Sequence, residues 1–350
     1  MPSVPDPTNL YSETAAGRLS PAVAGALPRV YVPNVKANTV TVIDATTLTV
    51  IDTFPVGVNP QHVVPSYDLT TLWVANNAEG LTTGSLTPID PTTGKPGRPI
   101  PVDDPYNLYF TPDGRSAMVV AEALKRLDFR DPRTMALQAS VAVPNCAGVN
   151  HVDFSIDGKY LIATCEFQSG LVKVDLVERT VLGYLALPRG MPQDIRVSPD
   201  GQTYFVADMM AGGVHLIDGA RFAVTGFIPT GIGTHGLYPS RDGKKLYVAN
   251  RGSRQIRGRP KGPGNVAVID FATRTVEVVW AVPGGGSPDM GNVSSDGTQL
   301  WLSGRFDDVV YVFDTRTGQV TTIPVGKEPH GLTVWPQPGR YSLGHTGNMR

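Results

Sequence analysis

The sequence lacks the features that mark several protein classes. It has two cysteines, Cys146 and Cys165, and no Cys-x-x-Cys pair, which excludes a disulfide-rich scaffold. No apolar run approaches the roughly 20 residues that a membrane-spanning helix needs. The net charge is −1, which argues against a general nucleic-acid or membrane-surface role. The sequence also contains no GxSxG, HExxH or Walker motif.

The first 28 residues are rich in proline and lack a basic start followed by an apolar stretch. They therefore do not read as a secretory signal, and we expect a cytoplasmic protein. We interpret residues 1–28 as an N-terminal arm and residues 29–350 as a single folded domain. No segment of useful length has the period of a helix.

The chain does contain a repeat of about 40 to 50 residues, which indicates stacked units or propeller blades. Each repeat has a short strand, a tight turn that is usually Asp-Gly, and a second strand ending in a polar group. Examples are "NHVDFSIDGKYLIATCE" (150–166), "QDIRVSPDGQTYFVADM" (193–209) and "THGLYPSRDGKKLYVANR" (234–251). Third and fourth strands follow, as in "NVAVID" and "VTTIPV".

Seven such repeats of four strands predict an all-β, seven-bladed propeller. The chain enters at a second strand, "RVYVPN" (29–34), and the seventh first strand, "HGLTVW" (330–335), lies near the C-terminus. We therefore expect the N- and C-terminal strands to pair in one blade and close the ring, which removes two exposed sheet edges. The tail "RYSLGHTGNMR" (340–350) is either surplus to that blade or competes with residues 29–34 for the same place.

These repeats resemble the YVTN family of β-propeller repeats. "LYVAN" (246–250), "VYVPN" and "LWVAN" are variants of the motif that names the family. The resemblance covers roughly residues 29 to 336 and implies a propeller fold. It implies no single function, because related architectures include surface proteins, lactonase-like enzymes, a lyase for lactone antibiotics and haem d1 propellers.

Histidines recur at the start of the first strands, which should line the central channel. His62 and His151 stand six residues before the turn aspartate, in a position that Asn107 and Asp194 share in other repeats. His235 stands one residue earlier, and His330 likewise precedes a glycine. Neighbours in a regular strand point to opposite faces, so these positions meet only if the backbone there is irregular.

Four imidazoles that converge at the mouth of a channel predict a metal site. We expect a divalent metal, with iron, copper, zinc and manganese not distinguished, held by His62, His151, His235 and His330. His345 lies near the position that the seventh repeat would contribute to the channel mouth, and it could join the four histidines. His215 falls in a third strand, and we interpret it as structural. The simpler interpretation is that each histidine only forms a hydrogen bond with a neighbouring loop.

Polar residues at the ends of the second strands should surround the same mouth. Glu122 and Glu166, together with Asp194, are candidates for proton transfer or for accepting a hydrogen bond from a metal-bound imidazole. Arg251 and Arg305, with Asn107, are candidates for binding an anionic substrate. The insertion at 251–265 is basic and should lie on this face, either as a cover or as a solvated loop. Cys146 and Cys165 should lie near it as ordinary thiols, a disulfide or metal ligands.

We therefore expect a metal-dependent enzyme that acts on a small organic molecule, by lyase, hydrolase or oxygenase chemistry. One alternative is a non-catalytic propeller that binds a protein or a metal. Another is a lactonase-like hydrolase that works without a metal, with histidine and carboxylate as acid and base. No nucleic-acid or membrane partner is expected.

Overall fold

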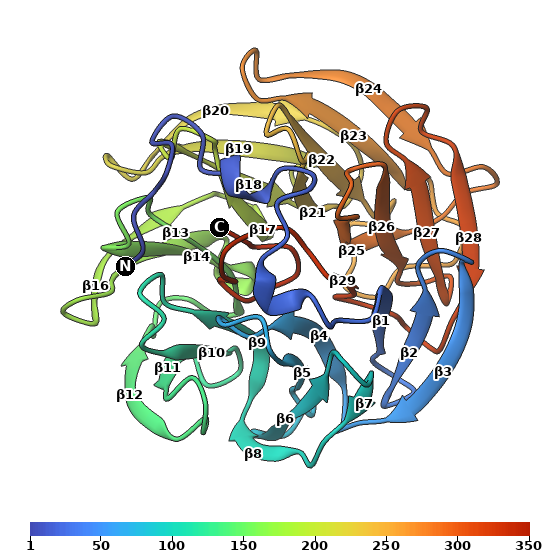
Figure 1. Ribbon diagram of the computed structural model, residues 1–350. Helices are drawn as coiled ribbons and strands as arrows, with labels where there is room; N and C mark the ends of the chain where they lie inside the picture. Colours follow the sequence, from blue (N-terminus) through green and yellow to red (C-terminus); the bar gives the residue numbers. More distant parts are fainter.

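The computed structural model describes residues 1–350 and contains seven four-stranded antiparallel blades around a central channel (Figure 1). The expected all-β, seven-bladed propeller is confirmed. Helix is limited to three short 3-10 turns, η1 (Ser12–Thr14), η2 (Pro21–Val23) and η3 (Glu166–Gln168). None of these has the length and apolar character to cross a bilayer.

The strands fall into four sets according to their distance from the channel. The innermost strands are β29 (Thr333–Trp335), β4 (Pro60–Pro65), β9 (Pro105–Phe110), β13 (Val149–Phe154), β17 (Pro192–Val197), β21 (Thr234–Pro239) and β25 (Pro288–Val293). The second strands are β1 (Arg29–Asn34), β5 (Leu72–Asn76), β10 (Ala117–Ala121), β14 (Tyr160–Cys165), β18 (Thr203–Asp208), β22 (Lys245–Asn250) and β26 (Gln299–Gly304).

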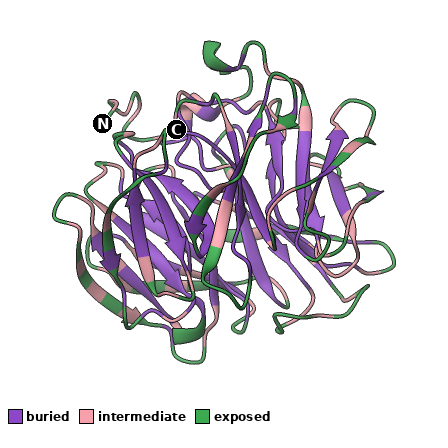
Figure 2. Ribbon diagram, turned by 90° about the horizontal axis from the view of Figure 1, so that it is seen from below, coloured by how far each residue is buried: buried purple, intermediate pink, exposed green.

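The third strands are β2 (Thr39–Asp44), β6 (Thr83–Asp90), β11 (Arg126–Arg130), β15 (Gly170–Asp175), β19 (Gly213–Asp218), β23 (Asn265–Asp270) and β27 (Val309–Asp314). The outer strands are β3 (Thr49–Pro55), the pair β7 (Lys95–Pro96) and β8 (Ile100–Asp103), β12 (Leu137–Ala142), β16 (Thr180–Ala186), β20 (Ala223–Pro229), β24 (Thr275–Ala281) and β28 (Val320–Pro324). Exposed residues concentrate in the loops and the outer strands, while the inner strands are buried (Figure 2).

The Asp-Gly turns join the first and second strands, as the repeat predicts. In the turn after β21, Gly243 has a φ of +68°, a conformation that glycine adopts at no steric cost. Ser240 donates a hydrogen bond to the Asp242 carboxylate (2.6 Å), which in turn accepts one from the backbone N–H of Lys244 (3.1 Å). The same hydroxyl-to-aspartate bond recurs in the turns of five other blades. The repeat is therefore encoded locally, turn by turn.

The ring closes through the two ends of the chain. β29 pairs antiparallel with β1, so the first blade has the strand order β29-β1-β2-β3, as expected from the sequence. Val334 packs in the apolar cluster shared with the seventh blade, while Trp335 packs in the cluster shared with the second blade. One short strand thus contributes to the core on both of its sides.

The segment after β29 neither extends this blade nor displaces β1. It turns into the channel at the end where the Asp-Gly turns lie, and it forms backbone bonds with β9, from Phe110 N–H to Leu343 C=O (3.0 Å) and from His345 N–H to Leu108 C=O (2.9 Å). Arg350 is buried and forms an ion pair with Asp153 of β13 (2.9 Å). The tail is thus surplus to ring closure and fills one end of the channel.

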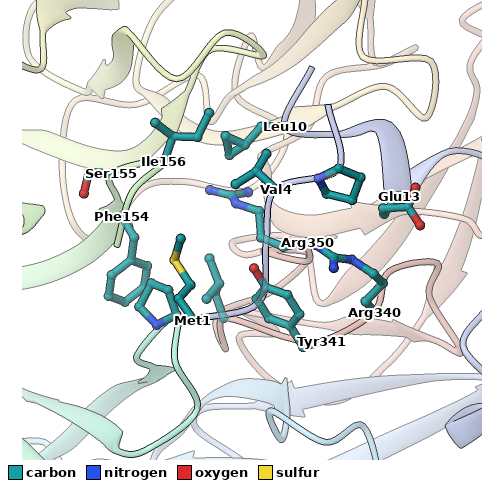
Figure 3. A pocket seen from close by; sticks show the side chains of 13 residues that line it. Met1, Val4, Leu10, Glu13, Phe154, Ser155, Ile156, Arg340, Tyr341 and Arg350 are labelled. Atoms are coloured by element: carbon teal, nitrogen blue, oxygen red, sulfur yellow. The ribbon is translucent and has the colours of Figure 1, made fainter. Parts of the chain in front are cut away.

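The N-terminal arm lies across the same end of the channel. Tyr11 donates a hydrogen bond to the carbonyl oxygen of Val197 (2.6 Å), and the Arg350 guanidinium lies 5.5 Å from the centre of the Tyr11 ring. Figure 3 shows Arg350 and Tyr341 of the tail among arm residues, with Phe154 of β13 beside them. Both chain ends therefore cover the same face of the ring (Figure 1).

Candidate metal and substrate site

The innermost strands are irregular at the point where the histidines stand. Between β13 and β14 the pairing passes from Val149 to Val152, so Asn150 and His151 have no partners across the ladder. β21 skips His235 and Gly236 in the same way, and β4, β9, β17 and β25 show comparable shifts. A bulge changes the direction in which side chains point. In these six blades two neighbouring positions can therefore both face the axis.

The four predicted metal ligands lie together on the axis, and all four are buried. The ring centres of His62 and His330 are 4.8 Å apart, those of His62 and His151 5.5 Å, and those of His151 and His235 6.2 Å. The cluster contains two groups of three residues whose donor atoms lie within 4.8 Å of one another. We call His62, His151 and His345 the inner group, and His235, Asp289 and His330 the cavity-side group.

His345 enters the inner group from the C-terminal tail. Its ring centre is 4.7 Å from that of His151 and 5.1 Å from that of His62. The irregular turn before residue 345 hid this position in the repeat. His215, by contrast, lies in β19 and pairs with Asp208 (3.1 Å), away from the axis.

Most nitrogens of the axial imidazoles have no hydrogen-bond partner in the chain. Both nitrogens of His62, His151 and His330 are buried and unpartnered, as is Nε2 of His345. Burial lowers the pKa of each of these histidines well below the usual value, and neighbouring positive charges add to the effect; they are His62, His151, His330 and His345. These imidazoles are therefore neutral and retain a lone pair, which is the form that binds metals.

Asp289 is the carboxylate of the cavity-side group, and the sequence did not single it out. Its Oδ1 lies 2.8 Å from His235 Nδ1, and its oxygens lie 3.7 Å from Arg251 and 4.0 Å from Arg305. Although burial raises the pKa of Asp289, Arg251, His235 and Arg305 hold it well below the usual value. The repeat could have pointed to Asp289, because Met290 and Gly236 are equivalent positions of two repeats, and Asp289 precedes Met290 as His235 precedes Gly236.

Above the cavity-side group lies a cavity of about 260 Å³. Its walls include both glutamates and both arginines that were predicted for the site, and its floor includes two histidines: Glu122, Glu166, Arg251, Arg305, His235 and His330. Tyr106 lines it as well, and Ile256 of the basic insertion reaches its rim. None of the inner group lines this cavity.

The two glutamates of the cavity differ in their surroundings. Burial raises the pKa of Glu122 well above its usual value, and the nearby Glu166 carboxylate raises it further. Glu166 accepts a hydrogen bond from the Asn150 amide (3.1 Å), which fixes its position at the start of η3. Both effects disfavour the ionised form of Glu122.

Two other predicted site residues lie below the cavity. Asp194 forms an ion pair with Arg196 (3.0 Å) and accepts backbone hydrogen bonds from Ile195 and from Leu237 of the next blade (both 2.9 Å). Asn107 contacts Nδ1 of His345 through its amide (2.8 Å). Neither residue lines the cavity, so both lie beside the inner group and away from a substrate position.

The two cysteines belong to the fourth blade, near the start of β13 and the end of β14. Cys146 precedes β13 and Cys165 ends β14, and the two form a disulfide. Both are buried in the apolar cluster between the third and fourth blades. This pairing leaves neither sulfur as a metal ligand.

Similarity to known proteins concerns the fold. A comparison of the sequence with curated proteins finds no match. Among solved structures, Kuenenia stuttgartiensis hydrazine synthase is similar with a TM-score of 0.64 and 20% identity, covering 85% of this chain and 92% of that chain. A protein of Bacteroides uniformis, whose description proposes 6-phosphogluconolactonase activity, has a TM-score of 0.66 and 18% identity, covering 87% and 98%.

Dihydro-heme d1 dehydrogenase NirN has a TM-score of 0.61 and 16% identity, covering 87% of this chain and 75% of that chain. At these identities the likeness shows a shared architecture alone. The sequence comparison is more specific, because one family model matches residues 13–338, which include the whole repeat region that the YVTN-like motifs defined. The chain therefore belongs to the family of YNCE-like β-propellers.

Proposed function

We propose that this protein is a metal-dependent enzyme. Its axial histidines would hold a divalent metal, and the cavity above them would bind a small organic substrate with an acidic group. The observation that carries the proposal is the set of unpartnered nitrogens on His62, His151 and His330. A buried polar group without a hydrogen bond costs about 1–3 kcal/mol, so a cluster of them indicates a ligand that satisfies them.

The chemistry of the donors fits a transition metal. Neutral imidazoles suit zinc, copper, iron and nickel, and Asp289 adds one negative charge to the cluster. A bound metal would supply Lewis acidity, or a redox centre if it is iron or copper. The protein's own groups would orient the substrate and move its protons.

The arginines and glutamates of the cavity divide these tasks between them. Arg305 is held by Glu328 (3.1 Å) and, with Arg251, offers N–H groups at the edge of the cavity to an acidic substrate group. Glu122, with its raised pKa, is the candidate proton donor. Glu166 would accept a hydrogen bond from the substrate on the same side.

A second candidate function is that of a hydrolase that needs no metal. The charge contact between His235 Nδ1 and Asp289 Oδ1 (2.8 Å) favours it, because a nearby carboxylate stabilises the imidazolium that forms when a histidine acts as a general base, although the hydrogen-bond contact of Nδ1 is to Met290 Sδ (3.1 Å). His235 also lines the cavity. The similarity in fold to the Bacteroides uniformis protein is compatible with such chemistry but does not argue for it.

Elemental analysis of protein purified without an affinity tag or a chelator tests the proposal. The informative variant is His151→Ala/His235→Ala, which removes one imidazole from each group. The control is His215→Ala, which removes a histidine away from the axis. We expect metal in the wild type and in the control, and loss of it in the double variant with the circular dichroism spectrum unchanged.

Absence of metal from the wild type, even after incubation with Fe²⁺, Zn²⁺ and Cu²⁺, would overturn the proposal. The hydrolase would then be favoured if His235→Ala abolished turnover of a lactone panel. A non-catalytic binding module would be favoured if no turnover were found in any variant.

A further inference from the structure

We infer that the axial cluster holds two metal ions, one enclosed by the inner group and the other bound by the cavity-side group at the floor of the cavity. This inference rests on the proposed function, and it divides the metal site into two positions. The two groups share no residue, and each supplies three donor atoms within 4.8 Å of one another. They are also adjacent, since the rings of His62 and His330 lie 4.8 Å apart.

The bulges of the inner strands create these two levels. Six of the seven inner strands have such a shift, and in β13, β17, β21 and β25 it leaves two consecutive residues without partners across the ladder, so side chains face the axis at two levels. His235, Asp289 and His330 occupy the ring nearer the cavity, and His62 and His151 occupy the ring below it. The one-residue offset among the histidines of the sequence is therefore the difference between the two levels.

The imidazole of the tail completes the inner group. Two blades contribute glycine to the lower ring, Gly236 and Gly331, and a Cβ on Gly331 would collide with the ring of His62. The ring of His345 lies against those of His62 and His151, and it comes from the opposite end of the channel. The inner group is complete only because the tail is docked, and its donors are closed off from the cavity.

His345 can serve as a ligand through Nε2 in one tautomer. Its Nδ1 must then carry the proton, whereas in this structure Nδ1 faces the amide nitrogen of Asn107 (2.8 Å) and the amide oxygen accepts a hydrogen bond from Leu108 N–H (2.9 Å). Binding of a metal through Nε2 therefore requires the Asn107 amide to rotate and give up the bond from Leu108. Asp194 lies 3.4 Å from Nε2 and would supply a negative charge beside the ion. Asn107 is thus a positioning residue for His345, and the sequence-based expectation that it binds substrate does not fit its place.

The two positions should differ in affinity and in access. The inner group offers three neutral imidazoles in an enclosed setting, which is typical of a tightly held ion. The cavity-side group opens to the cavity, and Arg251 and Arg305 lie within about 4 Å of its carboxylate. These guanidiniums keep Asp289 ionised but repel a cation, so the ion at the floor of the cavity should bind more weakly.

Titration of metal-free full-length protein with Co²⁺ tests the inference, because the visible absorption of Co²⁺ reports its ligands. We expect about two equivalents to bind to the wild type, in two phases with different spectra. His345→Ala should remove the tighter phase and leave the weaker one. Asp289→Asn should do the reverse, and His215→Ala should keep both phases.

Each outcome decides between the alternatives. A single equivalent in the wild type, lost in both His345→Ala and Asp289→Asn, would leave one shared site: the inference fails and the proposed function stands. No binding at all would overturn both. If His345→Ala unfolds, His345→Gln keeps the size of the side chain without an imidazole, and a normal melting curve with the tighter phase retained would also overturn the inference.

Discussion

At the scale of single residues, the carboxylates of the channel have different surroundings that sequence alone could not separate. Asp194 is fully buried, faces Arg196 and accepts backbone hydrogen bonds from two blades. Glu122 lies at the wall of the cavity, and burial next to Glu166 raises its pKa. The first joins neighbouring blades through its hydrogen bonds, whereas the second is the proton donor that we propose.

This difference predicts a large loss of stability for one isosteric substitution and a small change for another. Asp194→Asn leaves the Arg196 charge buried without its counter-ion, so the free energy of unfolding should fall by about 3–5 kcal/mol. Glu122→Gln replaces a carboxyl whose ionised form is disfavoured by burial and by Glu166, so the change should stay within about 1 kcal/mol. Urea unfolding followed by circular dichroism measures both, and equal losses would show that the assignment of roles is wrong.

At the scale of elements, the repeat made the blades predictable, because each Asp-Gly turn and each alternating strand is a local signal. The order of the strands and the pairing of residues 29–34 with the last strand followed from the phase of the repeat. The bulges did not follow, because they depend on how seven strands crowd around one axis. The sequence therefore showed four histidines in two offset positions but could not show that both positions face the channel.

The same limit explains what was missed in the site. Asp289 occupies the same position of its repeat as His235 and His330 do in theirs. The signal in the sequence was the recurring histidine, and a single aspartate at this position did not by itself indicate a metal ligand. His345 lies in a tail with no strand pattern, and only the docked tail brings it to His62 and His151. Long-range contacts of this kind are set by the closed ring and not by local sequence.

The disulfide between Cys146 and Cys165 is the covalent tie between two neighbouring elements of the fourth blade. It spans 19 residues of sequence and is buried in the core. Disulfides persist in oxidising compartments, so its redox state in protein from the native source tests the expected cytoplasmic location. Alkylation of free thiols followed by mass measurement distinguishes the two states.

Loss of this bond should destabilise the protein by a measurable amount. Cys146→Ser/Cys165→Ser should lower the free energy of unfolding by about 2–4 kcal/mol, the usual effect for a loop of this size. Wild-type protein unfolded in the presence of dithiothreitol serves as the control and should show a similar loss. An unchanged unfolding curve for both would mean that the bond contributes nothing to stability.

At the scale of the whole molecule, the stability of the ring depends on β29. This strand has three residues, yet it is the innermost strand of the first blade and the last one to be synthesised. Its side chains alternate between the clusters shared with the seventh and second blades. The tail that carries His345 leaves from its end, so ring closure and the completion of the inner group depend on the same strand.

Trp335 is the residue at which this dependence can be tested. Its indole is buried in the cluster of the first and second blades, so Trp335→Ala should cost about 3–5 kcal/mol in the free energy of unfolding. The control Val279→Ala removes an exposed apolar side chain from β24 and should have almost no effect. Because the variant also loosens the anchor of the tail, binding of Co²⁺ at the inner group should weaken while the cavity-side group keeps its ion. A variant that is destabilised but binds both ions normally would show that the tail docks independently of the strand that precedes it.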